Sequence, residues 1–226
     1  MIFNYNIYSY LIRPVRSSRL IHRYLFGYLP SRKSESHGAY WDWTTLVMRR
    51  AIVKYINSDT HHLDVGTGSV GCLAIYSCLR SNCSSIDAVD YIQEVLDSAR
   101  ECSNSLRLPI QFYWSDLFSN IKGKFDVITF NAPYIDKNKG DKLGLFDNKI
   151  SEARFSGGTG GGETIARFLF DAKNYMKDDG KILLGVCHYH ISKSKINDLI
   201  IASGLELHDR IQMMFMQSSV YILQKE

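Results

Sequence analysis

The stretch LDVGTGSVG, residues 63–71, decides the fold that this sequence predicts. It starts inside an apolar strand, HHLDV (61–65), and leads into a helix expected over residues 70–82. Glycines 66, 68 and 71 let the backbone turn tightly and let a ligand approach the main chain. The start of the helix offers unbonded N–H groups. The stretch therefore predicts a ligand site where a strand meets a helix.

On both sides of this stretch, strands alternate with helices. The further strands are expected at 85–89, 110–114, 125–130 and 181–186, and the further helices at 44–57, 91–106, 163–176 and 192–203. The last two strands, 206–211 and 219–223, are expected to pair with each other. The pattern predicts an α/β fold with a seven-stranded, mostly parallel sheet, helices on both faces and a C-terminal antiparallel hairpin. In such folds, ligands bind at the carboxyl ends of the strands.

Acidic residues around the glycines favour a ligand that contains a nucleoside. Asp90 ends the second strand, where a carboxylate can accept hydrogen bonds from both ribose hydroxyls. Asp64 would repel a diphosphate but can hold an ammonium group, directly or through water, so a methyl donor is favoured over a dinucleotide. After the third strand, Asp116 of SDLF (115–118) can accept from an adenine amine, and Leu117 can pack against the ring.

The stretch FDVITFNAPYID (125–136) ends a buried strand with residues suited to a planar amide or amino nitrogen. Such a nitrogen is a poor nucleophile because its lone pair is delocalised. The side-chain oxygen of Asn131 can accept one N–H and the backbone carbonyl of Ala132 the other, with Pro133 restricting the backbone and Tyr134 stacking on the flat group. These acceptors stabilise the positive charge that develops on nitrogen in the transition state. The alternative interpretation is a simple turn.

Taken in order, these segments resemble a class I S-adenosylmethionine-dependent methyltransferase of the N-P-P-Y type, and within it the HemK/PrmC-like glutamine N5-methyltransferases. YWDWTTL (40–46) is similar to that family's acid-Thr-x-Leu segment. The resemblance implies S-adenosylmethionine as cofactor, no metal, a methyltransferase domain over 41–226, and Asn131, Ala132, Pro133 and Tyr134 as catalytic residues. It implies a donor site made of Thr45, Asp64, Gly66, Thr67, Gly68, Asp90, Tyr91, Asp116, Leu117 and Asn131.

The sequence departs from this family in three places. Ala132 stands where the family has its first proline, and Val70 where many relatives have glycine. Only about 40 residues precede the acid-Thr-x-Leu segment, which is too few for the helical domain that docks the release factor in bacterial relatives. Some relatives without that domain work with a partner subunit, which is a second possibility here.

Charge sets the first residues apart from the rest. Residues 1–50 carry eight Lys/Arg and two acids, a net charge of +6, whereas the other 176 residues carry nineteen and twenty-one, a net charge of −2. We expect residues 1–40 to form a basic helical extension in a cytoplasmic protein. An acid-free start also resembles an organelle transit peptide. A third interpretation is an RNA contact, with tyrosines available to stack on bases: Tyr5, Tyr8, Tyr10 and Tyr24.

Composition excludes several classes of protein. The five cysteines include no CxxC pair, which argues against a zinc knuckle or a disulfide framework. No apolar run approaches the roughly 20 residues of a membrane span. His188 and His190 follow the fifth strand, and two histidines do not make a metal site. A strand-end role is expected for His188, with a place on the pocket wall as the alternative. The glycines of 157–162 are interpreted as a flexible lip over the site, as a helix-entry loop, or as both.

The function that the sequence predicts is methyl transfer to a planar nitrogen, with a protein glutamine of the release-factor type as the expected acceptor. The open alternatives are an RNA base methyltransferase that uses the basic extension, a tailoring enzyme for small molecules or peptides, and a donor-binding module without turnover.

Overall fold

A single seven-stranded sheet organises the computed structural model, which describes residues 14–226 except 39, 147–148 and 215. The strand order is β3-β2-β1-β4-β5-β7-β6, with β7 antiparallel to both neighbours and the other pairs parallel. This confirms the predicted mostly parallel sheet with its C-terminal hairpin. The strands are β1 (His61–Val65), β2 (Ser85–Asp90), β3 (Ile110–Trp114), β4 (Phe125–Asn131), β5 (Met176–Cys187), β6 (Leu205–Gln212) and β7 (Ser218–Lys225).

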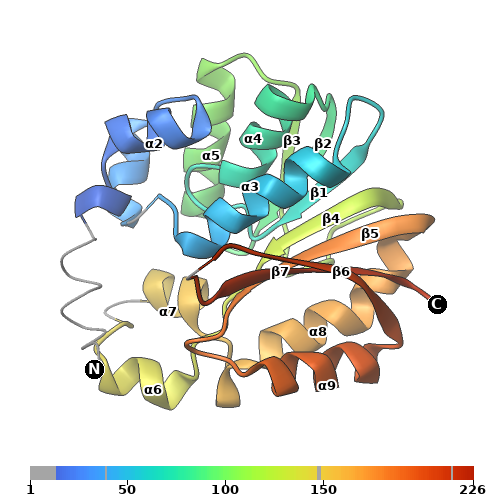
Figure 1. Ribbon diagram of the computed structural model, residues 1–226. Helices are drawn as coiled ribbons and strands as arrows, with labels where there is room; N and C mark the ends of the chain where they lie inside the picture. The colour runs from blue at the N-terminus through green and yellow to red at the C-terminus, as the bar shows by residue number, and fades with distance from the viewer. Residues whose placement is uncertain (1–13, 39, 147–148, 215) are drawn as a thin grey trace.

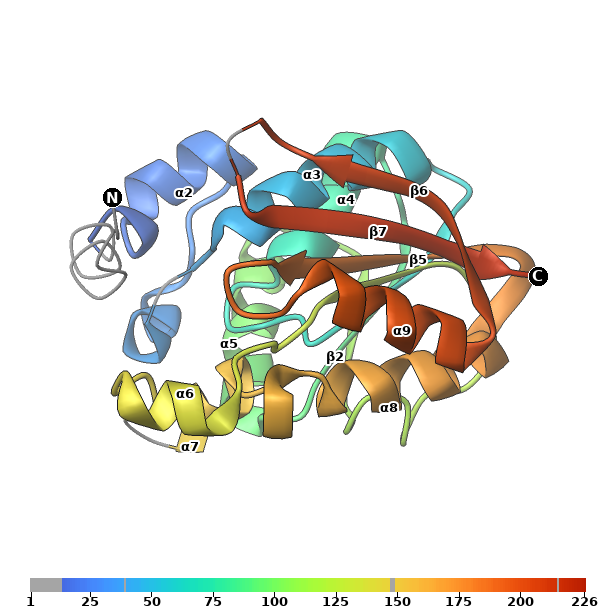
Figure 2. The ribbon, with the colours of Figure 1, turned by 60° about the horizontal axis from the view of Figure 1, so that its bottom comes forward.

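Helices cover both faces of this sheet (Figures 1 and 2), with α3, α4 and α5 on one side and α8 and α9 on the other. The α-helices are α2 (Arg19–Phe26), α3 (Trp43–Tyr55), α4 (Cys72–Ser81), α5 (Gln93–Ser105), α6 (Lys137–Lys142), α7 (Lys149–Phe155), α8 (Glu163–Ala172) and α9 (Lys193–Ser203). Three short 3₁₀ helices are η1 (Arg32–His37), η2 (Thr159–Gly161) and η3 (Lys173–Tyr175). Of the described residues, none belongs to a helix long and apolar enough to span a bilayer.

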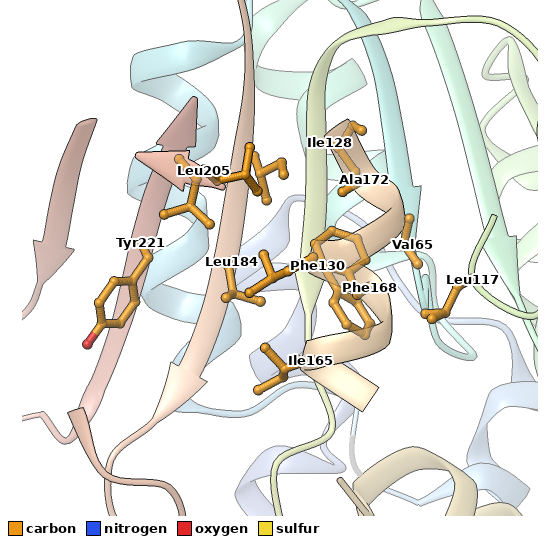
Figure 3. Packing of buried hydrophobic residues seen from close by; sticks show 14 of the residues in the cluster. Val65, Leu117, Ile128, Phe130, Ile165, Phe168, Ala172, Leu184, Leu205 and Tyr221 are labelled. Atoms are coloured by element: carbon orange, nitrogen blue, oxygen red, sulfur yellow. The ribbon is translucent and has the colours of Figure 1, made fainter. Parts of the chain in front are cut away.

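The alternation of side chains along the strands builds two apolar cores. In β5, Ile182 and Leu184 belong to the cluster beneath α8 and α9, whereas Leu183 belongs to the cluster beneath α3 and α4. Figure 3 shows the first cluster, in which Phe130 of β4 meets Phe168 of α8, with ring centroids 4.4 Å apart. Both faces of β4 are buried, and its residues from Val127 to Phe130 are accordingly apolar except Thr129.

The region between β4 and α8 differs from the prediction. Two short helices, α6 and α7, stand there, although no element was expected between 131 and 157. The sequence KNKGDK of α6 has no apolar periodicity; its start is fixed instead by Asp136, whose carboxylate accepts from Lys139 N at 2.9 Å. At the other end of α8, the helix stops at Ala172 rather than 176, because the chain joins β5 at Met176, opposite Phe125.

The described part of the N-terminal extension packs against the glycine turn between β1 and α4. Tyr28 donates its hydroxyl to the Val70 carbonyl at 2.6 Å, and Ser34 donates to the Ser69 carbonyl at 2.8 Å. Buried His22 contacts the Tyr28 carbonyl through Nδ1 (3.1 Å) and Cys72 Sγ through Nε2 (3.3 Å). The extension is therefore a structural support of the turn. Tyr5, Tyr8 and Tyr10 lie outside the described residues.

Candidate active site

A cavity of about 950 Å³ opens at the carboxyl ends of β1, β2 and β4, where the fold predicted a ligand site. Of the thirteen residues that the sequence singled out, twelve line this cavity, and Asp64 does not. The twelve are Thr45, Gly66, Thr67, Gly68, Asp90, Tyr91, Asp116, Leu117, Asn131, Ala132, Pro133 and Tyr134. The glycine turn and the N-A-P-Y segment follow the neighbouring strands β1 and β4, so the fold brings them side by side in one cavity.

The glycine turn is held in place by backbone hydrogen bonds to β2. Thr67 N donates to the Val89 carbonyl at 2.9 Å, and Gly68 N donates to Asp90 Oδ2 at 2.9 Å. Gly68 has a φ of +70°, and a Cβ there would meet no atom within 4 Å, so its backbone borders open space. Only a glycine adopts this φ at no steric cost. The turn can therefore receive a ligand against its main chain.

Asp64 is buried behind the turn and does not itself line the cavity. Its Oδ2 accepts from the Thr67 hydroxyl at 2.8 Å, and its Oδ1 accepts from the Thr129 hydroxyl at 2.7 Å. Thr129 stands directly opposite Asp64 in the β1–β4 register, so both side chains point into the same buried layer. Burial raises the pKa of Asp64 to about 6. Asp64 therefore fixes the position of Thr67 in the turn through this hydrogen bond.

The same buried layer contains His62. Its Nε2 lies 2.8 Å from Thr129 Oγ1 and its Nδ1 lies 3.0 Å from Ser77 Oγ, and burial lowers its pKa to about 3. A neutral ring can donate at one nitrogen and accept at the other, so it satisfies both hydroxyls without a buried charge. His62 therefore completes the polar network behind the turn.

Two predicted acids reach the cavity. Asp90 accepts from Gly68 N through Oδ2 and from Ile92 N through Oδ1, and burial raises its pKa. Each carboxylate oxygen has a second lone pair, so Asp90 can still accept hydroxyl hydrogen bonds. Asp116 is more exposed and pairs with Arg167 of α8 at 2.7 Å, a partner that the sequence pattern did not reveal. The ion pair uses Asp116 Oδ2, so Oδ1 of the same carboxylate takes no part in it.

Asn131 ends β4, next to the glycine turn, and the two ends of its carboxamide have different surroundings. Its Nδ2 donates to Asp42 Oδ1 and Thr45 Oγ1, both at 3.3 Å. Its Oδ1 is buried and has no hydrogen-bond partner. Next to it, Ala132 N donates to the Gly185 carbonyl at 3.2 Å, and within the described chain no donor bonds the Ala132 carbonyl. The two oxygens that the sequence assigned to a substrate N–H group are thus not occupied by internal bonds.

Tyr134 is anchored by its hydroxyl. The hydroxyl donates to Asp42 Oδ2 at 3.2 Å and lies 3.3 Å from Thr44 Oγ1. Its ring lies against His190, with centroids 5.8 Å apart and planes at 25°. His190 lines the cavity, whereas His188 contacts Ser219 and the Ile191 carbonyl at the strand end. The strand-end expectation therefore fits His188, and His190 is a wall residue.

The glycine-rich loop clamps the N-A-P-Y segment from outside. Ile135 N donates to the Phe155 carbonyl and Gly157 N donates to the Ile135 carbonyl, both at 2.9 Å. A Cβ on Gly157 would overlap the Gly161 carbonyl and come within 2.9 Å of the Pro133 carbonyl. The loop also leads into α8, so the helix-entry interpretation is confirmed. Through these backbone hydrogen bonds, the glycine-rich loop also holds the N-A-P-Y segment in place.

Two functional candidates were missed. Asp42 joins Thr45, Asn131 and Tyr134, and its spacing to Thr45 is that of a helix N-cap and its N3 residue, a signal that was present in the sequence. Arg154 lines the cavity from α7 and donates to the His37 carbonyl. No local pattern points to Arg154, because a residue in a short helix gains its position from tertiary packing alone.

Comparison with known proteins agrees with this site. The family model described as methyltransferase small domain matches residues 41–162. This match covers more than half of the chain, including the glycine turn and the N-A-P-Y segment.

The chain belongs to this methyltransferase family.

Two curated relatives carry more specific names. A protein of Methanocaldococcus jannaschii named as a protein N5-glutamine methyltransferase is 31% identical over 155 residues, which are 69% of this methyltransferase and 75% of the relative. The release factor glutamine methyltransferase of Streptococcus pneumoniae is 36% identical over 126 residues, 55% of this chain and 44% of the relative. The chain thus spans most of the archaeal relative but less than half of the streptococcal one.

Solved structures share the fold. The ribosomal protein L11 methylase of Lactobacillus delbrueckii subsp. bulgaricus has a TM-score of 0.62 at 17% identity and covers 81% of this methyltransferase and 78% of its own chain. A methyltransferase from Pyrococcus furiosus has a TM-score of 0.62 at 18% identity, with 98% of both chains covered. At these identities the likeness concerns the fold, which is that of class I methyltransferases.

Proposed function

We propose that this methyltransferase transfers the methyl group of S-adenosylmethionine to the side-chain amide nitrogen of a glutamine in a protein. The observation that carries the proposal is the buried, unpartnered Oδ1 of Asn131, a residue that lines the same cavity as the glycine turn. A buried acceptor without a partner costs free energy, about 1–3 kcal/mol. A substrate N–H would supply the missing bond.

The residues around the glycine turn fit the donor. Gly68 leaves open space beside its backbone, Ser69 Oγ is buried without a partner, and Asp90 retains lone pairs for ribose hydroxyls. Tyr91 and Leu117 line the same part of the cavity and offer apolar surface for the adenine ring. When bound, the donor supplies an electrophilic methyl group on a sulfonium. The protein's own part is to hold that methyl group close to the acceptor.

The N-A-P-Y segment suits an acceptor with two hydrogens on a planar nitrogen. Asn131 Oδ1 and the Ala132 carbonyl would each accept one N–H, which leaves the nitrogen lone pair facing the methyl group. These acceptors are fixed in the folded protein, so they favour the transition state, in which the nitrogen is more positive. Holding the donor methyl group and the acceptor nitrogen in line lowers the activation barrier further by proximity. Tyr134 would cover the flat amide with its ring.

Two observations support a protein acceptor: the names of the relatives, and the internal hydrogen bonds made by arginines of the basic extension. One further relative, from Burkholderia pseudomallei, is named as a ribosomal protein uL3 glutamine methyltransferase. In the extension, Arg16 Nε donates to the Trp41 carbonyl at 2.7 Å, and Arg19 Nε donates to the Pro30 carbonyl at 3.0 Å. Because one N–H of each guanidinium group serves an internal contact, fewer donors are left for RNA phosphates.

The test is transfer from methyl-labelled donor to separate candidates. These are a release factor, ribosomal protein uL3, total RNA, and a small-molecule extract from the source cells. We expect label in one of the proteins, with mass spectrometry placing the methyl group on a glutamine side chain. Acid hydrolysis should then release labelled methylamine, because the methyl group sits on an amide nitrogen. Label confined to the RNA or to the small molecules would overturn the proposal.

A further inference from the structure

The Asp42 carboxylate joins the start of α3 to the N-A-P-Y segment. As the N-cap of α3, its Oδ1 accepts from Thr45 N and Thr45 Oγ1, both at 2.7 Å. The same oxygen accepts from Asn131 Nδ2 at 3.3 Å. Its Oδ2 accepts from the Tyr134 hydroxyl at 3.2 Å. One side chain therefore contacts both the proposed amide-binding residue and the proposed stacking residue.

The direction of these hydrogen bonds decides how the Asn131 carboxamide faces. An ionised carboxylate can only accept, so the group that Asn131 turns toward Asp42 has to be its NH₂. Thr45 Oγ1 donates its own proton to Asp42 and so can only accept from Asn131, at 3.3 Å. The two ends of a carboxamide have nearly the same shape, and the hydrogen-bond network alone distinguishes them. Asp42 and Thr45 thus leave Oδ1 as the end that faces away from them.

We propose that Asp42 is a positioning residue: by accepting from Asn131 and Tyr134, it orients the Asn131 carboxamide with Oδ1 toward the acceptor and fixes the Tyr134 ring. This inference rests on the proposed function for its kinetic consequence but not for its structural one. It explains why a buried Oδ1 is left without a partner, since the alternative orientation would place two acceptors against each other. Asp42 itself need not touch the substrate.

The variant that separates this role from a purely structural one is Asp42→Asn. Asparagine is about as good an N-cap as aspartate, so the start of α3 is retained. The new side chain carries its own NH₂, which lets the Asn131 carboxamide turn over. Losing one prepositioned acceptor typically costs 10²–10³ in kcat; with the correct orientation still partly populated, we expect kcat to fall by about ten- to a hundredfold. The donor Kd and the melting temperature should stay close to those of the wild type.

A second measurement does not depend on activity. The side-chain NH₂ of Asn131 can be observed by NMR in protein labelled with ¹⁵N-asparagine and assigned by its loss in Asn131→Ala. In the wild type, its protons should exchange slowly with solvent, because both are donated to protein acceptors, the half-buried Asp42 carboxylate and the buried Thr45 hydroxyl. In Asp42→Asn, the resonance should shift and its exchange should become faster. An unchanged resonance together with an unchanged kcat would overturn the proposal.

Two further variants sharpen the result. In an Asn131→Ala background, Asp42→Asn should reduce kcat far less than it does alone, because residues that act through one another are not additive. Asp209→Asn is a matched control: its carboxylate also accepts from a tyrosine hydroxyl, that of Tyr55 at 2.9 Å, but it does not line the cavity. It should leave kcat unchanged. If the wild type methylates something other than glutamine, the kinetics apply to that acceptor, and the NMR result still decides the role of Asp42.

Discussion

Gly161 packs against the backbone carbonyl of Tyr134 so closely that a Cβ at position 161 would overlap the carbonyl oxygen. Gly161 also has a φ of +71°, which favours glycine. The contact joins the glycine-rich loop to the last residue of the N-A-P-Y segment. The geometry of that segment thus depends on a glycine 27 positions further along the chain.

Gly161→Ala should therefore destabilise the protein and impair methyl transfer together. Overpacking costs about 1–3 kcal/mol, and the positive φ adds about 1 kcal/mol. Displacement of Tyr134 should also lower kcat. The matched control is Gly123→Ala, at a φ of +89° with no atom within 4 Å of the added Cβ. It should show only the φ cost, with kcat unchanged. Urea denaturation and steady-state kinetics measure both; equal losses in the two variants would contradict the clamp.

Asn131→Ala should remove an acceptor that acts mainly in the transition state. We expect kcat to fall about 10²–10³-fold, while the donor Kd from calorimetry changes little, because the glycine turn and Asp90 are left intact. Asn120→Ala is a suitable comparison, since its carboxamide bonds the Trp114 carbonyl and does not line the cavity. If Asn131→Ala kept full kcat, the proposed role of its oxygen would be wrong.

Tyr28→Phe should test the support that the extension gives to the glycine turn. It removes the hydroxyl that bonds the buried Val70 carbonyl at 2.6 Å. An unpartnered buried carbonyl costs about 1–3 kcal/mol, and a looser turn should weaken donor binding several-fold. Tyr24→Phe, whose side chain is 89% exposed on α2, should change neither the unfolding free energy nor the donor Kd. A donor Kd unaffected by Tyr28→Phe would show that the extension does not support the site.

Asp64 should make stability depend on pH in an unusual direction. Burial raises its pKa to about 6, above the value of about 4 in an unfolded chain. Between these values the folded state binds the proton more tightly, so the free energy of unfolding should fall as pH rises from about 4 to 6 and level off above that. The total change is about 3 kcal/mol.

The measurement is urea denaturation of wild type and Asp64→Asn between about pH 4 and 7. Their difference isolates Asp64, because groups present in both proteins cancel to first order. His22 is one such group: burial lowers its pKa to about 4, so it contributes in the opposite direction, with stability lost as pH falls. Parallel pH profiles for the two proteins would mean that the pKa of Asp64 is not raised in the folded state.

The sheet and the cavity could be predicted because their signals are local. Glycines 66 and 68 have to follow a strand and precede a helix, and Asp90 has to end the neighbouring parallel strand. Strand and helix periodicities are set by residues only a few positions apart. Parallel strands then bring their carboxyl ends to the same edge of the sheet, independently of the conformation of the loops. The approximate place of Asn131 beside the glycine turn followed from these rules alone.

The prediction failed where position depends on contacts between distant residues. Helices α6 and α7 have six and seven residues, too few for an apolar period to stand out. The bonding of Asp64 could not be predicted either, because its partner Thr129 comes from β4, 65 positions away.

The amino-acid sequence by itself determined the seven strands, the longer helices between them, the tight turn at the glycines and the types of side chain at residues 131–134, because backbone preference and side-chain type are properties of short segments. Only the tertiary structure decided which way each polar group faces. Asp42 and Asn131 are 89 positions apart, and the end of the carboxamide that stays unpartnered is set by an acceptor that packing alone brings next to it.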